Sequence, residues 1–145
     1  MATLSFTPLN GNEKVLLIDD EKPILSMVTQ MLKRLGYHVI PYDKSADALS
    51  CFESSPDEFD IVITDLTMPD INGDEIVARI KSIRKDIPVI LCTGFSEKMV
   101  DTKINGPKPD KVLMKPSGKD ELLNMIRMLL DESKQSKTEE RNKNE

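Results

Sequence analysis

The stretch IVITDLTMPDING, residues 61–73, decides the fold of this chain. Four residues, Ile61–Thr64, form an apolar and β-branched run that ends in the carboxylate of Asp65, and a loop containing proline and glycine follows. A short continuous apolar run bounded by turn residues is typical of a parallel strand buried on both faces. We therefore predict a strand over Ile61–Thr64, with Asp65 at its carboxyl end.

Three other apolar runs also end in polar side chains. The runs are residues 15–18, 90–92 and 112–114, and the side chains that follow them are Asp19, Asp20, Thr93 and Lys115. In an open parallel α/β sheet the carboxyl ends of the strands share one edge, and ligands bind in the crevice there. The sequence therefore predicts an acidic pocket that contains one lysine.

Apolar runs alternate with segments of helical period between Lys14 and Asp131, which favours βα units around a parallel sheet. The predicted strands are Val15–Ile18, His38–Tyr42, Ile61–Thr64, Pro88–Cys92 and Lys111–Met114. The predicted helices are Ile24–Leu35, Ser45–Ser54, one starting after Asn72, Ser96–Lys103 and Ser117–Leu130.

Local signals mark two of the helix ends. Pro23 lies in the first turn of the first helix and Gly36 just beyond its end, the usual asymmetry of helix termini. Asn72, followed three residues later by Glu75, resembles a capping box. Methionines such as Met27 fall on helical apolar stripes, so we expect them in the core.

Length and composition restrict the class of protein. The chain has 145 residues, 39% of them hydrophobic and 31% charged, which suits one soluble domain. Its apolar runs are far shorter than the ~18 residues that a membrane span needs, so we expect no membrane insertion. The net charge of −5 argues against direct nucleic-acid binding. Residues 1–12 do not resemble a secretory signal, and we expect a cytoplasmic location.

Composition also suggests three segments along the chain. Residues 1–13 are predicted to be a flexible leader, residues 14–131 the folded domain, and residues 132–145 a polar tail or linker. The last segment is polar with mixed charges and has no apolar stripe, which is typical of solvated chain ends.

Several carboxylates at one sheet edge repel one another. A pair of unit charges ~4 Å apart costs about 1 kcal/mol in water and about 4 kcal/mol at an effective dielectric constant of 20. A divalent cation offsets this repulsion, and a set of oxygen ligands favours Mg²⁺, with Mn²⁺ as the alternative. The simpler interpretation is that Asp19 and Asp20 cap the following helix. Two adjacent acids followed by Glu21 exceed what a cap requires.

The chemistry of these side chains suits phosphoryl transfer. A carboxylate acts as a nucleophile toward phosphoryl groups in some ATPases, and Asp65 is the natural nucleophile here. The ammonium of Lys115 would neutralise phosphoryl oxygens, and the hydroxyl of Thr93 would donate a hydrogen bond to one of them.

In order and spacing these motifs closely resemble the receiver domain of two-component response regulators. The resemblance covers about Lys14 to Asp131, and the motifs that carry it are VLLIDDE (15–21), DLTMPDING (65–73), Thr93-Gly94 and Lys115-Pro116. It implies a flavodoxin-like (βα)5 fold with a five-stranded parallel sheet of order 2-1-3-4-5. That order would make the first and third strands neighbours.

The resemblance also implies a metal site. Asp20, Asp65 and the backbone carbonyl of Thr67 would bind Mg²⁺ directly, and Asp19 would hold it through water. Asp65 would be the phosphoacceptor, and the phosphoryl donor would be a phosphohistidine on a sensor histidine kinase or histidine phosphotransfer domain.

Further roles follow from the same resemblance. Thr93 and Lys115 would contact the phosphoryl group, while Thr67 and Phe95 occupy the two variable positions that tune hydrolysis of the aspartyl phosphate. Such a receiver assists only its own phosphorylation and dephosphorylation, so we do not expect an enzyme. It would switch a downstream protein or a covalently linked output domain.

The chain departs from the family pattern in two places. Val112 occupies the position, three residues before the lysine, where many receivers have a Tyr or Phe that rotates inward. The segment 105–110, NGPKPD, replaces the commoner Gly-Ala turn before the last strand. Because valine has no ring to move, the sequence does not predict how phosphorylation would change the outer surface.

Three other functions remain as alternatives. The domain could be a receiver-like binding module that acts without phosphorylation. A phosphohydrolase with an Asp nucleophile would commonly place an acid where this chain has Thr67. A flavodoxin would place phosphate beside Asp19-Asp20-Glu21-Lys22, which would repel it. Residues 93–96, TGFS, resemble receivers attached to hybrid sensor kinases, so a domain cut from such a kinase is also considered.

Overall fold

The computed structural model describes residues 9–94, 107–115 and 118–143. Its strands are β1 (Lys14–Ile18), β2 (His38–Tyr42), β3 (Ile61–Asp65), β4 (Val89–Thr93) and β5 (Lys111–Met114). Its helices are α1 (Lys22–Arg34), α2 (Ser45–Ser54), the short 3₁₀ helix η1 (Pro56–Glu58), α3 (Gly73–Ile83) and α4 (Lys119–Lys143). The helix predicted at Ser96–Lys103, Phe95, and the predicted helix start at Ser117 lie outside the described residues.

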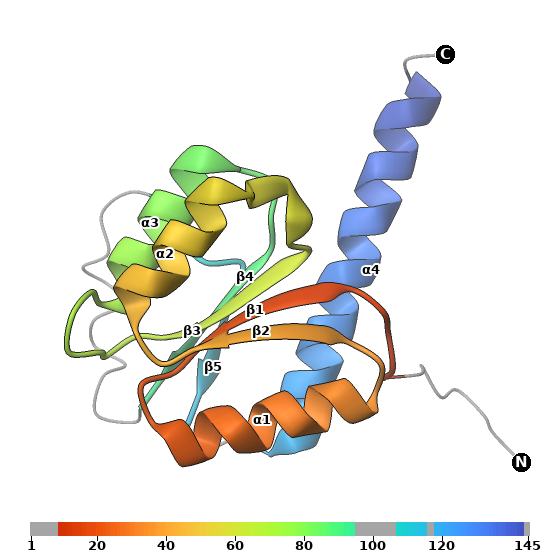
Figure 1. Cartoon of the computed structure of the whole chain (residues 1–145). Helices are drawn as coiled ribbons and strands as arrows, with labels where there is room; N and C mark the ends of the chain where they lie inside the picture. The colour runs from red at the N-terminus through yellow and green to blue at the C-terminus, as the bar shows by residue number, and fades with distance from the viewer. Residues whose placement is uncertain (1–8, 95–106, 116–117, 144–145) are drawn as a thin grey trace, which may run out of the picture.

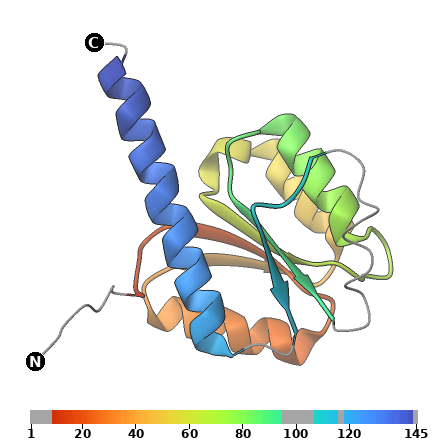
Figure 2. The ribbon, with the colours of Figure 1, turned by 180° about the vertical axis from the view of Figure 1, so that it is seen from behind.

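The five strands form one parallel sheet in the order β2-β1-β3-β4-β5, which confirms the predicted topology. Helices α1 and α4 cover one face of the sheet, and α2 and α3 cover the other (Figures 1 and 2). Strands β1 and β3 are paired in register, with Ile18 opposite Thr64. This pairing brings the residues that follow β1 beside the end of β3.

Burial on both faces explains the continuous apolar runs. Along β1, Val15 and Leu17 belong to a core cluster with α1 and α4, whereas Leu16 and Ile18 belong to a cluster with α2 and α3. Successive side chains of a strand point to opposite faces, so a strand covered on both sides must be apolar at every position. Only β5, at the sheet edge, keeps mainly exposed side chains among the described strands.

Helix α3 begins directly after Asn72, as predicted, but without the predicted side-chain cap. Gly36, with φ of +99°, follows α1 in the left-handed region that glycine tolerates. The predicted capping box at Asn72 is wrong. The Asn72 side chain instead accepts a hydrogen bond from the backbone N–H of Met68, 3.3 Å away, so it closes the preceding loop.

Packing contacts and helical structure continue on both sides of residues 14–131. Leu9 packs against the core and the N–H of Gly11 donates to Leu35, so residues 9–13 belong to the fold rather than to a leader. Helix α4 continues past the predicted end at Leu130 as far as Lys143 and projects beyond the sheet (Figure 1). The predicted polar segment is therefore helical through most of its length.

A buried ion pair accounts for the contacts on the amino-terminal side. Arg127 of α4 contacts Glu13 through two hydrogen bonds, with Nη2 only 2.6 Å from Oε2, and both side chains are largely buried. Arg127 also donates to the Tyr37 hydroxyl, and Lys134 lies 2.7 Å from Glu13. Burial acts to raise the pKa of Glu13, but hydrogen bonds from Arg127 and Lys134 outweigh it and lower the pKa to about 2. The segment before β1 is thereby attached to the last helix.

None of the helices within residues 9–94, 107–115 and 118–143 has the length and apolar character needed to cross a bilayer.

Removal of Arg127 tests this attachment. Arg127→Leu leaves Glu13 buried without its main partner, and we expect a loss of about 3 to 5 kcal/mol in the free energy of unfolding at pH 7. The matched control is Arg79→Leu, which breaks an exposed pair with Glu75 and should cost about 0.5 kcal/mol or less. Urea denaturation of both variants measures the loss in the free energy of unfolding. Equal losses would contradict a larger contribution from the buried pair.

The same experiment has a pH dependence with a defined sign. The folded-state pKa of Glu13, about 2, lies below the ordinary value of 4.5, so its contribution to stability is present above pH 4.5. That contribution is lost as the pH falls towards 2. The difference between wild type and Arg127→Leu should therefore shrink over this range.

Candidate functional site

An acidic cluster lies at the carboxyl edge of the sheet. Each of Asp19, Asp20 and Asp65 offers a carboxylate oxygen, and these oxygens all lie within 4.8 Å of one another. Asp65 ends β3, and Asp19 and Asp20 follow the neighbouring strand β1, so the pairing of β1 with β3 places them together. Asp19 and Asp65 are buried and Asp20 is exposed. The predicted pocket of three acids is present.

Asp19 has two contacts of different kinds. One oxygen accepts a hydrogen bond from the backbone N–H of Glu21, 2.9 Å away, which turns the chain into α1. The other lies 3.7 Å from the ammonium of Lys115. The N-cap residue of α1 is Glu21 and no side chain caps this helix, so the capping interpretation of Asp19 is wrong, and its second oxygen faces the cluster.

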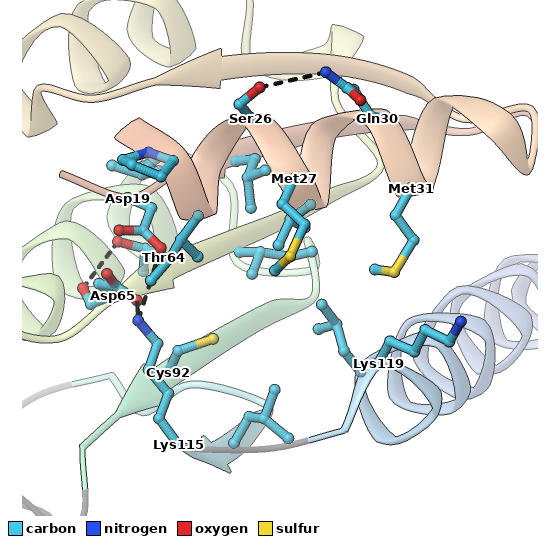
Figure 3. A pocket seen from close by; sticks show the side chains of 18 of the residues that line it. Asp19, Ser26, Met27, Gln30, Met31, Thr64, Asp65, Cys92, Lys115 and Lys119 are labelled. Carbon is cyan, nitrogen blue, oxygen red and sulfur yellow. Dashed lines mark hydrogen bonds and ion pairs between the residues drawn. The ribbon is translucent and has the colours of Figure 1, made fainter. Parts of the chain in front are cut away.

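Lys115 provides the positive charge of the site. Its Nζ lies 2.6 Å from Oδ1 of Asp65, and Figure 3 shows the side chain reaching from the end of β5 towards the two acids. Its backbone N–H donates to the Thr93 carbonyl at 2.7 Å, which fixes the start of the side chain. Partial burial lowers the pKa of Lys115, but the hydrogen bond to Asp65 and the nearby acids outweigh this and raise it. Lys115 therefore carries its charge at neutral pH.

The pKa of Asp65 is raised, as expected for a buried acid beside another acid. Burial and the neighbouring Asp19 raise the pKa of Asp65 to about 7, although Lys115 acts to lower it. One lysine thus compensates the cluster incompletely. A divalent cation favours the ionised form of nearby acids, so a bound ion would restore a nucleophilic carboxylate at Asp65.

Thr93 is placed differently from the other predicted residues. It is fully buried, and its hydroxyl lies against the sulfur of Met114 at 3.7 Å rather than against the acidic cluster. Thr67 is exposed in the loop two residues beyond Asp65. The structure therefore brings Asp19, Asp20, Asp65 and Lys115 together and keeps the Thr93 side chain outside the group.

A cleft of about 1070 Å³ extends from the cluster along α1 and the start of α4. Met27 and Met31 of α1 and Leu122 of α4 line it, and Figure 3 shows the two methionines along α1, with Met27 nearer the acids than Met31. The expectation that Met27 is buried is wrong, since 63% of it is exposed. Helical period alone could not separate a stripe that faces the core from one that lines an open cleft.

Comparisons with known proteins agree with this geometry. The family model for the response regulator receiver domain matches residues 15–127. The response regulator receiver protein CpdR of Brucella abortus is 30% identical over 118 residues, which cover 81% of this chain and 97% of CpdR. The chain belongs to the response regulator receiver family. Receiver domains bind Mg²⁺ at an acidic cluster, and the three carboxylates found here fit one hard cation.

Other relatives and structures support the same assignment. The sensor kinase CckA of Brucella abortus is 26% identical over 125 residues, but these cover only 13% of that kinase. The Arabidopsis thaliana response regulator ARR10 is likewise matched over 22% of its length. A receiver domain protein from Clostridium thermocellum has a TM-score of 0.75 at 28% identity, covering 84% of this chain and 97% of that one. Receiver domains thus occur in relatives both short and long.

Gly73 tests how tightly the site loop is packed. A Cβ at this position would overlap the backbone carbonyl of Asp65 and lie 2.7 Å from Leu91. Gly73→Ala should therefore displace the loop and lower the free energy of unfolding by about 1 to 3 kcal/mol. Gly118→Ala is the control, because a Cβ there meets nothing within 4 Å. Thermal unfolding of the two variants, with and without Mg²⁺, measures their stability. An equal loss of stability in Gly73→Ala and Gly118→Ala would contradict the packing argument.

The raised pKa of Asp65 predicts that ionisation of this acid weakens the metal-free fold. Its folded-state pKa of about 7 exceeds the ordinary 3.8, so the penalty is absent below pH 3.8 and complete above pH 7. Asp65→Asn should be more stable than wild type by about 1 to 2 kcal/mol at pH 8 without divalent ions, and less so at pH 4.

Denaturation at the two pH values in the presence of a chelator measures this difference. The control is Asp57→Asn, an exposed acid of η1, which precedes the amino end of β3, whereas Asp65 lies at the carboxyl end of that strand. A stability gain for Asp65→Asn that is the same at both pH values would refute the prediction.

Proposed function

We propose that Asp65 is the phosphoacceptor of a two-component phosphorelay, loaded in the presence of Mg²⁺ by a phosphohistidine on a sensor histidine kinase or histidine phosphotransfer domain. The observation that carries this proposal is the group of three carboxylates within 4.8 Å, with Lys115 2.6 Å from Asp65. Three acids and one cation leave an excess of negative charge that a divalent ion balances. In the solved structure of TrrA from Thermotoga maritima, 29% identical with a TM-score of 0.70 over 81% of this chain and 98% of that one, the receiver is in complex with Mg²⁺ and BeF.

The transfer forms one bond and breaks another. A carboxylate oxygen of Asp65 attacks the phosphorus, the bond between phosphorus and the histidine nitrogen breaks, and the imidazole leaves. Asp19, Asp20, Asp65 and the Thr67 carbonyl would hold Mg²⁺. When bound, this ion neutralises charge on the phosphoryl oxygens.

Lys115 and Thr93 then respond to the new group. A phosphoryl group adds a charge of about −1.5 to −2 near neutral pH. Lys115 exchanges its contact with Asp65 for one with a phosphoryl oxygen, and Thr93 leaves the Met114 sulfur to donate a hydrogen bond to another. Movement of Thr93 away from β5 carries the signal to the strand at the sheet edge.

The output is a change of affinity for a downstream protein or a covalently linked domain, and we place the protein in the cytoplasm. The receiver promotes only its own phosphorylation and dephosphorylation. Thr67 and Phe95 set the lifetime of the aspartyl phosphate.

A second candidate is a receiver-like module that binds partners without phosphorylation. The observation that favours it is Val112, which is 36% exposed on β5 where a movable ring would otherwise lie. Comparing partner binding with and without beryllofluoride distinguishes the two functions. Affinity that is insensitive to this phosphoryl mimic would support the second.

A small phosphodonor tests the first proposal. With Mg²⁺, acetyl phosphate should add one acid-labile, hydroxylamine-sensitive phosphoryl group to the wild type, and Asp65→Asn should remain unlabelled. Lys115→Ala should slow labelling by about 10²-fold, because a cation that stabilises the transferring group is lost. Intact-mass spectrometry follows the reaction, with Asp57→Asn as the control that retains labelling. Equal labelling of Asp65→Asn would eliminate this assignment.

A further inference from the structure

The loop between β3 and α3 is tied to a helix that the phosphoacceptor chemistry does not otherwise involve. Ser45, the first residue of α2, is completely buried. Its hydroxyl lies 2.9 Å from Oδ1 of Asp70 and 2.8 Å from the carbonyl oxygen of Ile71. It also lies 3.3 Å from the sulfur of Met68. A single side chain of α2 thus meets three residues of this loop.

Asp70 strengthens this contact from the loop side. Its second oxygen accepts a hydrogen bond from the backbone N–H of Ala46, 3.0 Å away, in the first turn of α2. The residue that precedes α2 is Lys44, which has no acceptor in its side chain, so Asp70 supplies the acceptor that a capping residue normally provides. The negative charge also suits a helix N-terminus. Loop and helix therefore stabilise each other.

The serine hydroxyl has only one proton for its three neighbours. It can donate to one acceptor at a time, and the carboxylate of Asp70 is the strongest, because bonds to charged acceptors are the stronger ones. Loss of Asp70 would leave the hydroxyl to the Ile71 carbonyl or the Met68 sulfur. The contact between Ser45 and Asp70 therefore selects one arrangement of the loop.

The part of the loop between these contacts carries Thr67. On one side, the N–H of Leu66 donates to Cys92 of β4 at 2.9 Å, which attaches the loop to the sheet. On the other side, the N–H of Met68 donates to Asn72, and the Met68 sulfur lies 3.3 Å from the Ser45 hydroxyl that donates to Asp70. Thr67 thus lies between Leu66, which is bonded to the sheet, and Met68, which is bonded within the loop and contacts Ser45 of α2.

We propose that Ser45 and Asp70 are positioning residues that orient the Thr67 carbonyl towards the divalent ion. They thereby raise the affinity of the site for that ion. This inference rests on the proposed function, because it assumes the metal site described above. Mg²⁺ demands near-ideal octahedral geometry, so a small displacement of one ligand weakens binding. Outer residues that orient metal ligands typically contribute 10- to 100-fold to metal affinity.

Metal binding without any phosphodonor is the direct test. Electron paramagnetic resonance of free Mn²⁺ gives its dissociation constant, and competition gives that of Mg²⁺. We expect Ser45→Ala and Asp70→Ala each to weaken binding by about tenfold. The double variant should be little worse than either single variant, because both residues act through one contact.

Two control variants match the chemistry without touching the loop. Ser54→Ala removes a hydroxyl from the exposed end of α2, where it bonds only to Ser50. Asp74→Ala removes a carboxylate that bonds the N–H of Glu75 in the first turn of α3. Both should bind Mn²⁺ like the wild type.

Labelling by acetyl phosphate over a range of Mg²⁺ concentrations supplies the second readout. Positioning predicts that the two variants need about tenfold more Mg²⁺ for half-maximal labelling and approach the wild-type rate when metal is saturating. A purely structural role would lower the melting temperature and leave the metal requirement unchanged, which would overturn the inference.

The failure of this inference differs from that of the proposed function. If wild type binds metal and is labelled at Asp65 while Ser45→Ala and Asp70→Ala retain its metal affinity, only the positioning role is lost. If wild type neither binds Mn²⁺ nor accepts a phosphoryl group, the metal site and the role of Ser45 are refuted together. Asp70 is exposed, so Asp70→Ala opens no buried cavity and keeps the test available.

Discussion

The close approach of Asp19 and Asp65 is the constraint on which the rest of this structure depends. When both are ionised, these buried carboxylates repel each other, and Lys115 compensates that repulsion only in part. They are held together because β1 pairs with β3, and that pairing is fixed by apolar side chains that pack on both faces of the sheet. The stability of the core thus maintains an unfavourable arrangement of charge. A divalent cation at this site would relieve the repulsion.

A buried acid lies at each end of the sheet, and its surroundings shift its pKa in opposite directions. At the amino end, Glu13 is met by Arg127 and Lys134, and hydrogen bonds lower its pKa to about 2. At the carboxyl end, Asp65 shares one lysine with its neighbours, and burial with Asp19 raises its pKa to about 7. The first arrangement is complete and holds the last helix in place. The second is incomplete and leaves negative charge that a divalent cation would balance.

The loop between β3 and α3 connects this site to the opposite helical layer. Gly73 allows the loop to return against the Asp65 carbonyl, and Asn72 closes it internally. Ser45 and Asp70 join it to α2, on the face of the sheet away from α1 and α4. The loop beside the acidic cluster therefore contacts the α2 layer, while the cleft runs along α1 and α4 on the other face of the sheet. The contacts with α2 therefore leave the cleft along α1 and α4 open.

The sequence alone determined the sheet and most of the acidic site. Apolar runs such as Ile61–Thr64 are strand signals that depend on local order, and parallel strands bring their carboxyl ends to one edge. The positions of Asp19, Asp20, Asp65 and Lys115 at the ends of such runs are therefore enough to group them. Their motifs also indicated the order of the strands, which the structure confirms.

Only the tertiary structure decided the contacts between residues far apart in the chain. Glu13 and Arg127 are 114 positions apart and Ser45 and Asp70 are 25 apart, so no local pattern links them. Composition likewise cannot show that residues 10 and 13 contact the last helix. The capping box predicted at Asn72 is absent for a similar reason. The Asn72 side chain could accept a hydrogen bond from Glu75, as the motif implies, or from Met68, and the folded loop brings Met68 to it.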